Sequence, residues 1–205
     1  MKLLTKNIDN ELYISTAMQD KMKGIQALNS YPPYIQFCID QREIIGTPCN
    51  RCYGFGTENY PNNKKRYIQN YNLLSNSVLP YYKIPYINAL FFRLDAIGEI
   101  ANSNYAKNLD NFICKNSQTQ FSIWTKRPEL IKRFRYNCIY IYSSKYINRP
   151  EALPKSFNKV FTVYSKDYLK ENKKIYINCG GKKCMDCQKC YNKRNKTVYI
   201  NEILK

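Results

Sequence analysis

Cysteine is the residue type in this sequence with the clearest chemical potential. The chain has nine cysteines and no histidine, and seven of the cysteines fall into two groups. The front group is Cys38, Cys49 and Cys52, and the tail group is Cys179, Cys184, Cys187 and Cys190. Closely spaced thiols are typical metal ligands, so both groups are candidate metal sites. Cys114 and Cys138 lie singly in apolar segments, where we expect them to be small buried side chains.

The tail group has the spacing of a metal site. Its four cysteines occupy the short segment 179–190, and Gly180 and Gly181 allow the backbone to fold back. Three of them follow one another at three-residue steps, which resembles the run around an iron–sulfur cluster, whereas structural zinc sites usually use two separated Cys-x-x-Cys pairs. The spacing favours an iron–sulfur cluster, and zinc is the alternative.

The front group supplies three thiols, which is too few for a tetrahedral zinc site made only of cysteine. Three thiolates hold a four-iron cluster and leave its fourth iron open for a substrate or cofactor. The other arrangement is one zinc ion that Cys49 and Cys52 share with cysteines of the tail. The sequence leaves both arrangements open.

Several common chemistries are excluded by what the sequence lacks. Without histidine there is no Ser-His-Asp or Cys-His catalysis and no histidine-based zinc enzyme. No phosphate-binding loop of the Walker type and no complete dinucleotide fingerprint occurs. The first residues carry no signal-peptide core, and the apolar run 87–94 is too short to cross a membrane, so we expect a cytoplasmic protein with reduced thiols and no membrane partner.

The charge is strongly positive. The chain has 33 Lys and Arg against 15 Asp and Glu, so the net charge is 33 − 15 = +18. Such a surface attracts polyanions, and DNA or RNA is the expected partner. The candidate contacts are Lys64, Lys65, Arg66, Lys126 and Arg127. The alternative is a coding bias towards lysine that yields only a solvated basic surface.

The pattern of apolar residues predicts an α/β fold in a single domain of 205 residues. We expect a loop-rich metal-binding N-terminal region over 1–60, an α/β core over 62–178 and a cysteine-rich metal-binding tail over 179–205. The expected helices are 62–75, capped by Asn62 or Asn63, then 101–113 and 128–134. The expected strands are 87–94, 120–125, 138–142, 160–164 and 175–177. Strands that alternate with helices predict a largely parallel sheet or a partial (β/α) barrel, with the functional residues after the strands, as in segments 95–99 and 125–127.

Five segments together carry a resemblance to a known family. They are Cys49–Tyr53 with its Cys-x-x-Cys-Tyr pattern, Phe91–Glu99, Phe121–Leu130, Lys159–Ser165 and Ile177–Tyr191. The succession resembles a family of small cysteine-cluster proteins of clostridia and their phages and plasmids. That family in turn resembles, more distantly, a shortened radical S-adenosylmethionine enzyme.

The resemblance implies site residues. Cys38, Cys49 and Cys52 would hold a four-iron cluster, Gly98 and Glu99 would form the turn that binds the amino group of S-adenosylmethionine, and the tail cysteines would hold an auxiliary cluster. For Glu99 an ordinary position in the first turn of the following helix is the alternative.

The leading hypothesis is a mobile-element-associated iron–sulfur protein, resembling a minimal radical S-adenosylmethionine enzyme, that acts on nucleic acid or a nucleotide. No catalytic residue is assigned. The alternatives are a non-enzymatic, zinc-stabilised nucleic-acid-binding protein and an inhibitor or adaptor that binds a host protein through its basic face.

Overall fold

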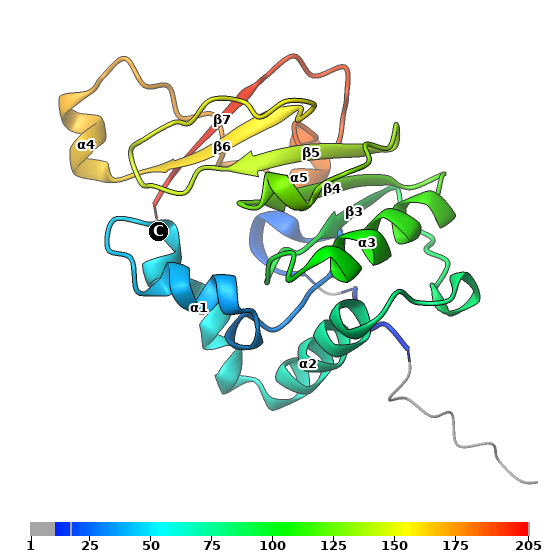
Figure 1. Ribbon diagram of the computed structural model, residues 1–205. Coiled ribbons are helices and arrows are strands. Elements are labelled where there is room, and N and C mark those ends of the chain that lie inside the picture. Colours follow the sequence, from blue (N-terminus) through cyan, green and yellow to red (C-terminus); the bar gives the residue numbers. More distant parts are fainter. Residues whose placement is uncertain (1–10, 17, 205) are drawn as a thin grey trace, which may run out of the picture.

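The computed structural model describes residues 11–16 and 18–204 and is built around a seven-stranded sheet. The strands are β1 (Ile14–Ser15), β2 (Gln26–Leu28), β3 (Phe91–Leu94), β4 (Gln120–Thr125), β5 (Cys138–Ser143), β6 (Lys159–Tyr164) and β7 (Tyr199–Ile203). They lie side by side in chain order (Figure 1), and only the β1–β2 pair is antiparallel. The expected α/β class with a mostly parallel sheet is confirmed.

One face of the sheet packs against two helices, α2 (Pro61–Asn76) and α3 (Ser103–Lys115), as Figure 1 shows. Side chains alternate between the faces of a strand, so every second residue points to this layer. Phe92 of β3 and Phe121 of β4 thereby meet Phe112 of α3, with ring centroids 5.4–5.9 Å apart. This apolar layer is the main core.

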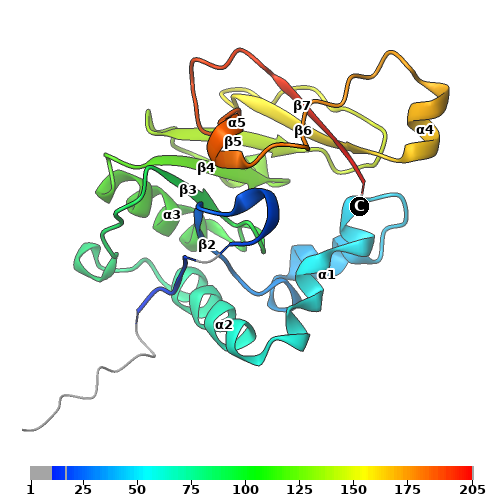
Figure 2. The ribbon, with the colours of Figure 1, turned by 180° about the vertical axis from the view of Figure 1, so that it is seen from behind.

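The opposite face is covered by the two ends of the described chain. Ile25 and Phe91 pack with Tyr191 of the tail, and Ile139, Ile141 and Ile200 form a second small cluster against Cys179 and Cys190. The short helix α5 (Cys184–Cys187) lies over this face, which Figure 2 shows from behind. The tail group is therefore attached directly to the sheet.

The remaining helices lie near the carboxyl ends of the strands. In Figure 1 the β5 arrow points towards the side on which α1 (Gln36–Arg42) lies, and α4 (Lys166–Glu171) follows β6 on that side. No helix among the described residues is long and apolar enough to span a bilayer. The carboxyl edge is thus the place where segments that follow different strands meet.

Local signals explain where the two long helices begin. The Asn102 side chain accepts a hydrogen bond from the Tyr105 backbone N–H (3.0 Å), which caps α3. Helix α2 begins at Pro61, where the missing backbone N–H costs nothing because the first turn of a helix leaves such groups without a partner. The expected cap by Asn62 or Asn63 is wrong, because both lie inside the helix and Tyr60 is the capping residue.

Several element boundaries differ from expectation. Segment 175–177 is not a strand, because β7 occupies the place beside β6 along five paired residues. The expected strand over 87–94 forms only from Phe91, and the expected helix over 128–134 is a single 3-10 turn, Pro128–Leu130. The N-terminal region 1–60, expected to be rich in loops, contains β1, β2 and α1 in its described part.

Candidate metal and cofactor site at the carboxyl edge

The front cysteines come from the segment that follows β2. Cys38 lies in α1, Cys49 lies in the 3-10 turn Pro48–Arg51, and Cys52 directly follows that turn. Thr47 fixes the turn, because its hydroxyl accepts from the Asn50 backbone N–H (3.2 Å) and donates to the Ile44 carbonyl (2.9 Å). All three thiols are half-buried.

The three front thiols lie together beside Glu99. Burial raises the pKa of the Cys38 thiol, and the negative charges of Glu99, Cys49 and Cys52 raise it further. Burial also raises the pKa of Cys49, which the Lys126 ammonium group opposes, while Cys52 and Glu99 add to the increase. The structure therefore places the front cysteines within electrostatic range of the glutamate that the resemblance assigns to the same site.

A constrained turn, residues 95–99, carries this glutamate away from β3. Asp95 and Gly98 both have positive φ, 49° and 114°. A Cβ on Gly98 would lie only 2.0 Å from Ser30 Oγ, so position 98 accepts glycine alone. The turn is pinned to the end of β2, because Ile97 N donates to Asn29 Oδ1 and Ser30 N donates to the Ile97 carbonyl, each at 3.0 Å.

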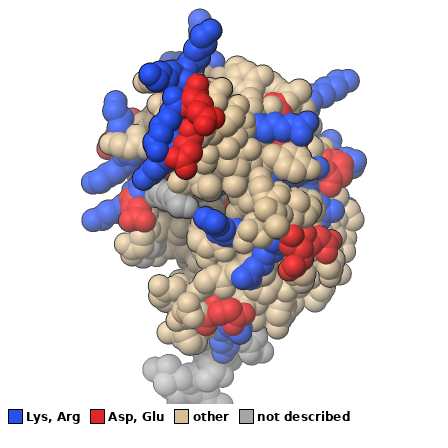
Figure 3. Space-filling view, turned by 90° about the vertical axis from the view of Figure 1, so that its left-hand side faces the viewer, with Lys and Arg blue, Asp and Glu red and all other residues tan. Residues whose placement is uncertain are grey.

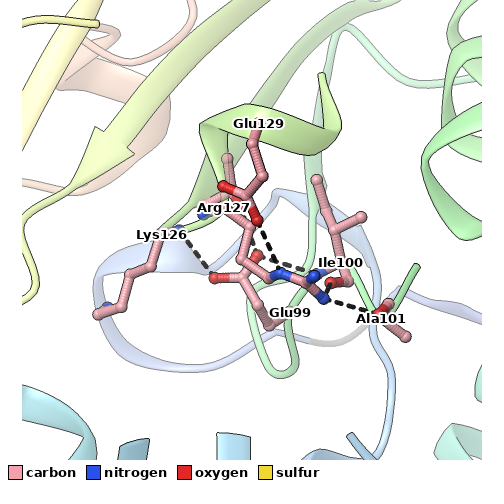
Figure 4. Close-up of polar contacts among 7 residues, drawn as sticks. Glu99, Ile100, Ala101, Lys126, Arg127 and Glu129 are labelled. Atoms are coloured by element: carbon pink, nitrogen blue, oxygen red, sulfur yellow. Dashed lines mark hydrogen bonds and ion pairs between the residues drawn. The ribbon is translucent and has the colours of Figure 1, made fainter. Parts of the chain in front are cut away.

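The Glu99 carboxylate is held by three donors (Figure 4). Oε1 accepts from Thr125 Oγ1 (2.5 Å) and Ile100 N (2.9 Å), and Oε2 accepts from Lys126 N (2.8 Å). Burial raises its pKa, and these hydrogen bonds oppose the increase. The alternative position in the first turn of the next helix is wrong, because α3 begins at Ser103. Glu99 instead ties the 95–99 turn to the end of β4.

Asp95 is a second buried carboxyl at this edge. Its Oδ1 accepts from the hydroxyls of Tyr105 (2.6 Å) and Ser30 (3.2 Å), whereas Oδ2 is buried without a hydrogen-bond partner among the described residues. Burial raises its pKa to about 7. The side chain keeps a proton in the folded protein at pH values where the unfolded chain has lost it.

We expect Asp95→Asn to weaken the pH dependence of stability. The folded-state pKa is raised from 3.8 to about 7, so the wild-type free energy of unfolding falls as pH rises across that interval. Asparagine tolerates positive φ and removes this titration. Chemical denaturation at several pH values gives the free energy of unfolding as a function of pH. That free energy should change less with pH between about 4 and 7 in the variant than in the wild type. An equal pH dependence in both proteins would contradict the raised pKa of Asp95.

The tail cysteines form a second group on the covered face of the sheet. Burial raises the pKa of Cys190 to about 12; Arg93 opposes this increase, and Cys179, Cys184 and Cys187 add to it. The Lys21 ammonium group lies 3.7 Å from Cys179 Sγ and 2.5 Å from Glu202. Positive φ at Gly180 and Gly181 bends the chain between Cys179, which forms an isolated bridge with Glu202 of β7, and α5. The tail group is thus assembled from one short segment, with cations beside it.

The two cysteine groups have different electrostatic neighbours. The charges that act on Cys38 are those of the front cysteines and the neighbouring carboxylates, and the cysteines that act on Cys190 all belong to the tail. The arrangement in which Cys49 and Cys52 share one zinc ion with tail cysteines stays a prediction. Within the described residues no group of three or more Cys, Asp or Glu side chains is arranged to hold a metal ion. Metal binding at either group stays a prediction.

The single cysteines have different surroundings. Cys138 is buried, as expected, whereas Cys114 is exposed, so the expectation of a buried side chain is wrong there. Cys114 is on the outward side of α3, whose inward side carries Leu109, Phe112 and Ile113. Its exposed thiol lies outside both groups.

The predicted nucleic-acid contacts fall on two elements. Lys64, Lys65 and Arg66 lie at the start of α2; Lys64 pairs with Glu58 (2.5 Å) and Arg66 donates to the Tyr13 hydroxyl (2.7 Å). Lys126 and Arg127 directly follow β4. Lys126 Nζ donates to Ser143 Oγ (2.9 Å), and the Arg127 guanidinium donates to the carbonyls of Ile100 (2.8 Å) and Ala101 (2.6 Å) (Figure 4).

These contacts give the cations of the carboxyl edge a structural role. Arg127 also pairs with Glu129 (3.1 Å) and lies over the Phe37 ring, next to Cys38. Figure 3 shows Lys and Arg side chains spread over one face of the molecule with acidic side chains beside several of them. That face is mixed in sign rather than a continuous basic surface.

Three site residues were missed by the sequence patterns. Arg93 lies over the Trp124 ring, 3.8 Å from its centroid. Burial raises the thiol pKa values of Cys184 and Cys190, and the Arg93 charge opposes this increase. A single charge inside the apolar run of β3 was the available signal. Lys21 and Asn29 gave none, because their partners, Glu202 and Ile97, are distant in sequence.

No protein-family model, curated protein or solved structure matches this chain. The two cysteine groups and the 95–99 turn are therefore the observations from which a function is inferred.

Proposed function

We propose that the protein is an iron–sulfur protein that binds S-adenosylmethionine at the front cysteines and acts on nucleic acid or a nucleotide. The observation that carries this proposal is that Cys38, Cys49, Cys52 and Glu99 follow neighbouring parallel strands, β2 and β3, and lie within electrostatic range of one another at the carboxyl edge. Parallel strands in chain order from β2 to β7 are also the order of a (β/α) barrel, whose functional residues lie at that edge.

The donor set suits a cluster better than a single ion. A four-iron cluster binds each cysteine at a different iron, so its ligand sulfurs stand farther apart than those around one metal. Three thiols near one another match the number of protein ligands of a four-iron cluster with an open iron. The tail group supplies four thiols, a complete ligand set for a second cluster, and Lys21 and Arg93 offset its negative charge.

Glu99 retains the capacity to bind an ammonium group. A carboxylate has about four acceptor positions, and three protein donors occupy all but one of them here. The remaining position is on Oε2, which accepts only from Lys126 N. In this proposal the carboxylate is fixed by Thr125 and the backbone, and orients the amino group of S-adenosylmethionine.

The chemistry at such a site follows from the group it binds. When bound and reduced, a cluster with an open iron supplies one electron, which cleaves S-adenosylmethionine into methionine and a 5′-deoxyadenosyl radical. The protein's own contribution is to hold the three thiols, the 95–99 turn and Lys126 in one fixed arrangement. Ser30 and Asn29 keep that turn in register with the end of β2.

Anaerobic purification followed by iron, sulfide and zinc analysis tests the metal assignment. We expect iron and sulfide in equal amounts, with two clusters' content in the wild type. Cys49→Ser and Cys187→Ser should each lose about half of the iron, since each removes one ligand of a different four-iron cluster. Cys114→Ser is the matched control, because its thiol is exposed and outside both groups. Stoichiometric zinc without sulfide would instead support the zinc-stabilised alternative.

A further inference from the structure

Four strongly exposed tyrosines lie at the end of the sheet opposite the front cysteines. Tyr81, Tyr82, Tyr86 and Tyr136 are 53%, 79%, 79% and 71% exposed. Three of them precede β3 and the fourth precedes β5. Because β3 and β5 run in the same direction, the segments that precede them meet at the amino-terminal edge of the sheet.

Lys115, at the end of α3, holds this edge together. Its ammonium group lies 5.1 Å from the Tyr81 ring centroid and 4.5 Å from that of Tyr86, and it donates to the Tyr81 carbonyl (2.9 Å). The Tyr136 hydroxyl donates to the Ser117 carbonyl (3.3 Å), just beyond the same helix end. Two of the exposed rings, Tyr81 and Tyr86, therefore contact one cation, and Tyr136 is attached just beyond the same helix end. We call Tyr81, Tyr82, Tyr86, Lys115 and Tyr136 the tyrosine surface.

The backbone beneath the tyrosine surface is fixed. Asn116 accepts from Ile87 N (2.7 Å) through its side-chain oxygen and donates to the Pro85 carbonyl (3.1 Å) through its side-chain nitrogen. Asn137 donates to the carbonyls of Ile113, Asn116 and Thr119. Rings mounted on a fixed backbone lose little conformational entropy when they bind a flat ligand.

The charge around the tyrosine surface is positive. Segment 77–90 contains Lys83 and no acidic residue, and segment 131–137 contains Lys132, Arg133 and Arg135 and no acidic residue. The nearby Asp110 is already paired with Arg135 (2.6 Å). Arg133 forms a longer ion pair with Asp110, at 3.8 Å. Because its side chain is 71% exposed, it remains accessible to a ligand.

A groove of about 490 Å³ adjoins the tyrosine surface between α2 and segment 77–83. Ile68, Leu73 and Pro80 form part of its apolar wall and Lys65 and Lys83 supply its charges, and among the described residues no acidic side chain lines it. Pro80 and Lys83 line the groove and flank Tyr81 and Tyr82 in the sequence, so the groove ends beside the segment that carries these two tyrosines. Lys65 is one of the residues that the sequence predicted to contact nucleic acid.

We propose that the tyrosine surface and the adjoining groove bind single-stranded nucleic acid. Bases stack on the rings of Tyr82, Tyr86 and Tyr136, and phosphates contact Lys83, Lys115 and Arg133. Aromatic rings interleaved with cations are the usual means of binding single strands, whose base faces are open, whereas a duplex keeps those faces stacked inside. The proposal goes beyond the cysteine chemistry and shares no residue with either cysteine group.

Fluorescence anisotropy with labelled single-stranded DNA, single-stranded RNA and a duplex of the same sequence tests this inference on the full chain. We expect the single strands to bind more tightly than the duplex, with an affinity that falls as salt increases. The Tyr82→Ala/Tyr86→Ala double variant should bind single strands at least tenfold more weakly. Both side chains are exposed, so the variant should stay folded, and loss of the Tyr86 contact with Lys115 should lower the thermal unfolding midpoint only slightly.

Tyr176→Ala is the matched control, because Tyr176 is 78% exposed in the loop before the tail cysteines. Its affinity for single strands should equal that of the wild type. Equal binding of single strand and duplex, or equal affinities for the wild type and the double variant, would overturn the inference. So would the absence of any binding at low salt, which would leave the exposed rings to a protein partner. Cys49→Ser should bind single strands like the wild type, which separates this test from that of the metal site.

Discussion

Replacement of Gly98 by alanine is expected to lower the free energy of unfolding by about 3 to 5 kcal/mol. Two costs add at this position. At φ 114° a side chain strains the backbone, and the new Cβ would lie 2.0 Å from Ser30 Oγ. Either Ser30 or the 95–99 turn must move to remove this overlap, and a shift of the turn also displaces Glu99. Chemical denaturation of the purified variant measures the loss.

Gly46→Ala is the matched control for this substitution. Gly46 has φ 82°, but no described atom lies within 4 Å of the position where its Cβ would be. The control therefore carries backbone strain without overlap and should lose only about 1 to 2 kcal/mol. An equal decrease in the free energy of unfolding for the two variants would show that Ser30 moves aside at no energetic cost. It would also show that the 95–99 turn is not tightly held against β2.

Cys49→Ser is expected to abolish cleavage of S-adenosylmethionine by the reduced protein. Cys49 is one of the three front thiols, and without it the front group no longer supplies three ligands. Product formation under anaerobic conditions with a strong reductant measures the effect, and Cys114→Ser should retain the wild-type rate. Turnover that survives in Cys49→Ser would contradict the assignment of the front group as the cofactor site.

The core elements could be predicted because their local signals agree with the tertiary structure. The expected strand 120–125 has the bounds of β4, and the strands expected over 138–142 and 160–164 differ by one residue from β5 and β6. Buried parallel strands are continuous apolar runs, which stand out from their surroundings. The helices expected over 62–75 and 101–113 are α2 and α3, shifted by one or two residues.

The edge of the sheet could not be predicted in the same way. Segment 175–177 is Ile-Tyr-Ile, residues that favour strands, yet Tyr176 is 78% exposed and the segment forms no ladder. The place beside β6 belongs to β7, whose pairing depends on the return of the tail and not on its own sequence. Strand β2 has only three residues, which is too short for a periodic pattern.

The candidate site divides along the same line. Glu99 was expected at a carboxyl edge because it follows an expected strand, but its place beside Cys38, Cys49 and Cys52 was expected only from the family resemblance, since no strand was expected before these cysteines. The contacts that fix them could not be predicted. The hydrogen bond of Asn29 to Ile97 and that of Thr125 to Glu99 join positions far apart in sequence, and no local pattern reports such a partner.

The most direct test of the front site is electron paramagnetic resonance of the anaerobically reduced Cys187→Ser variant, recorded with and without S-adenosylmethionine. This variant should keep the front cluster and lose the tail cluster, so one signal is expected. If S-adenosylmethionine occupies an open iron beside Glu99, the g values of that signal shift when it is added, as they should in the wild type. An iron–sulfur signal that S-adenosylmethionine leaves unchanged in both proteins, or the absence of any such signal, would contradict the proposed site.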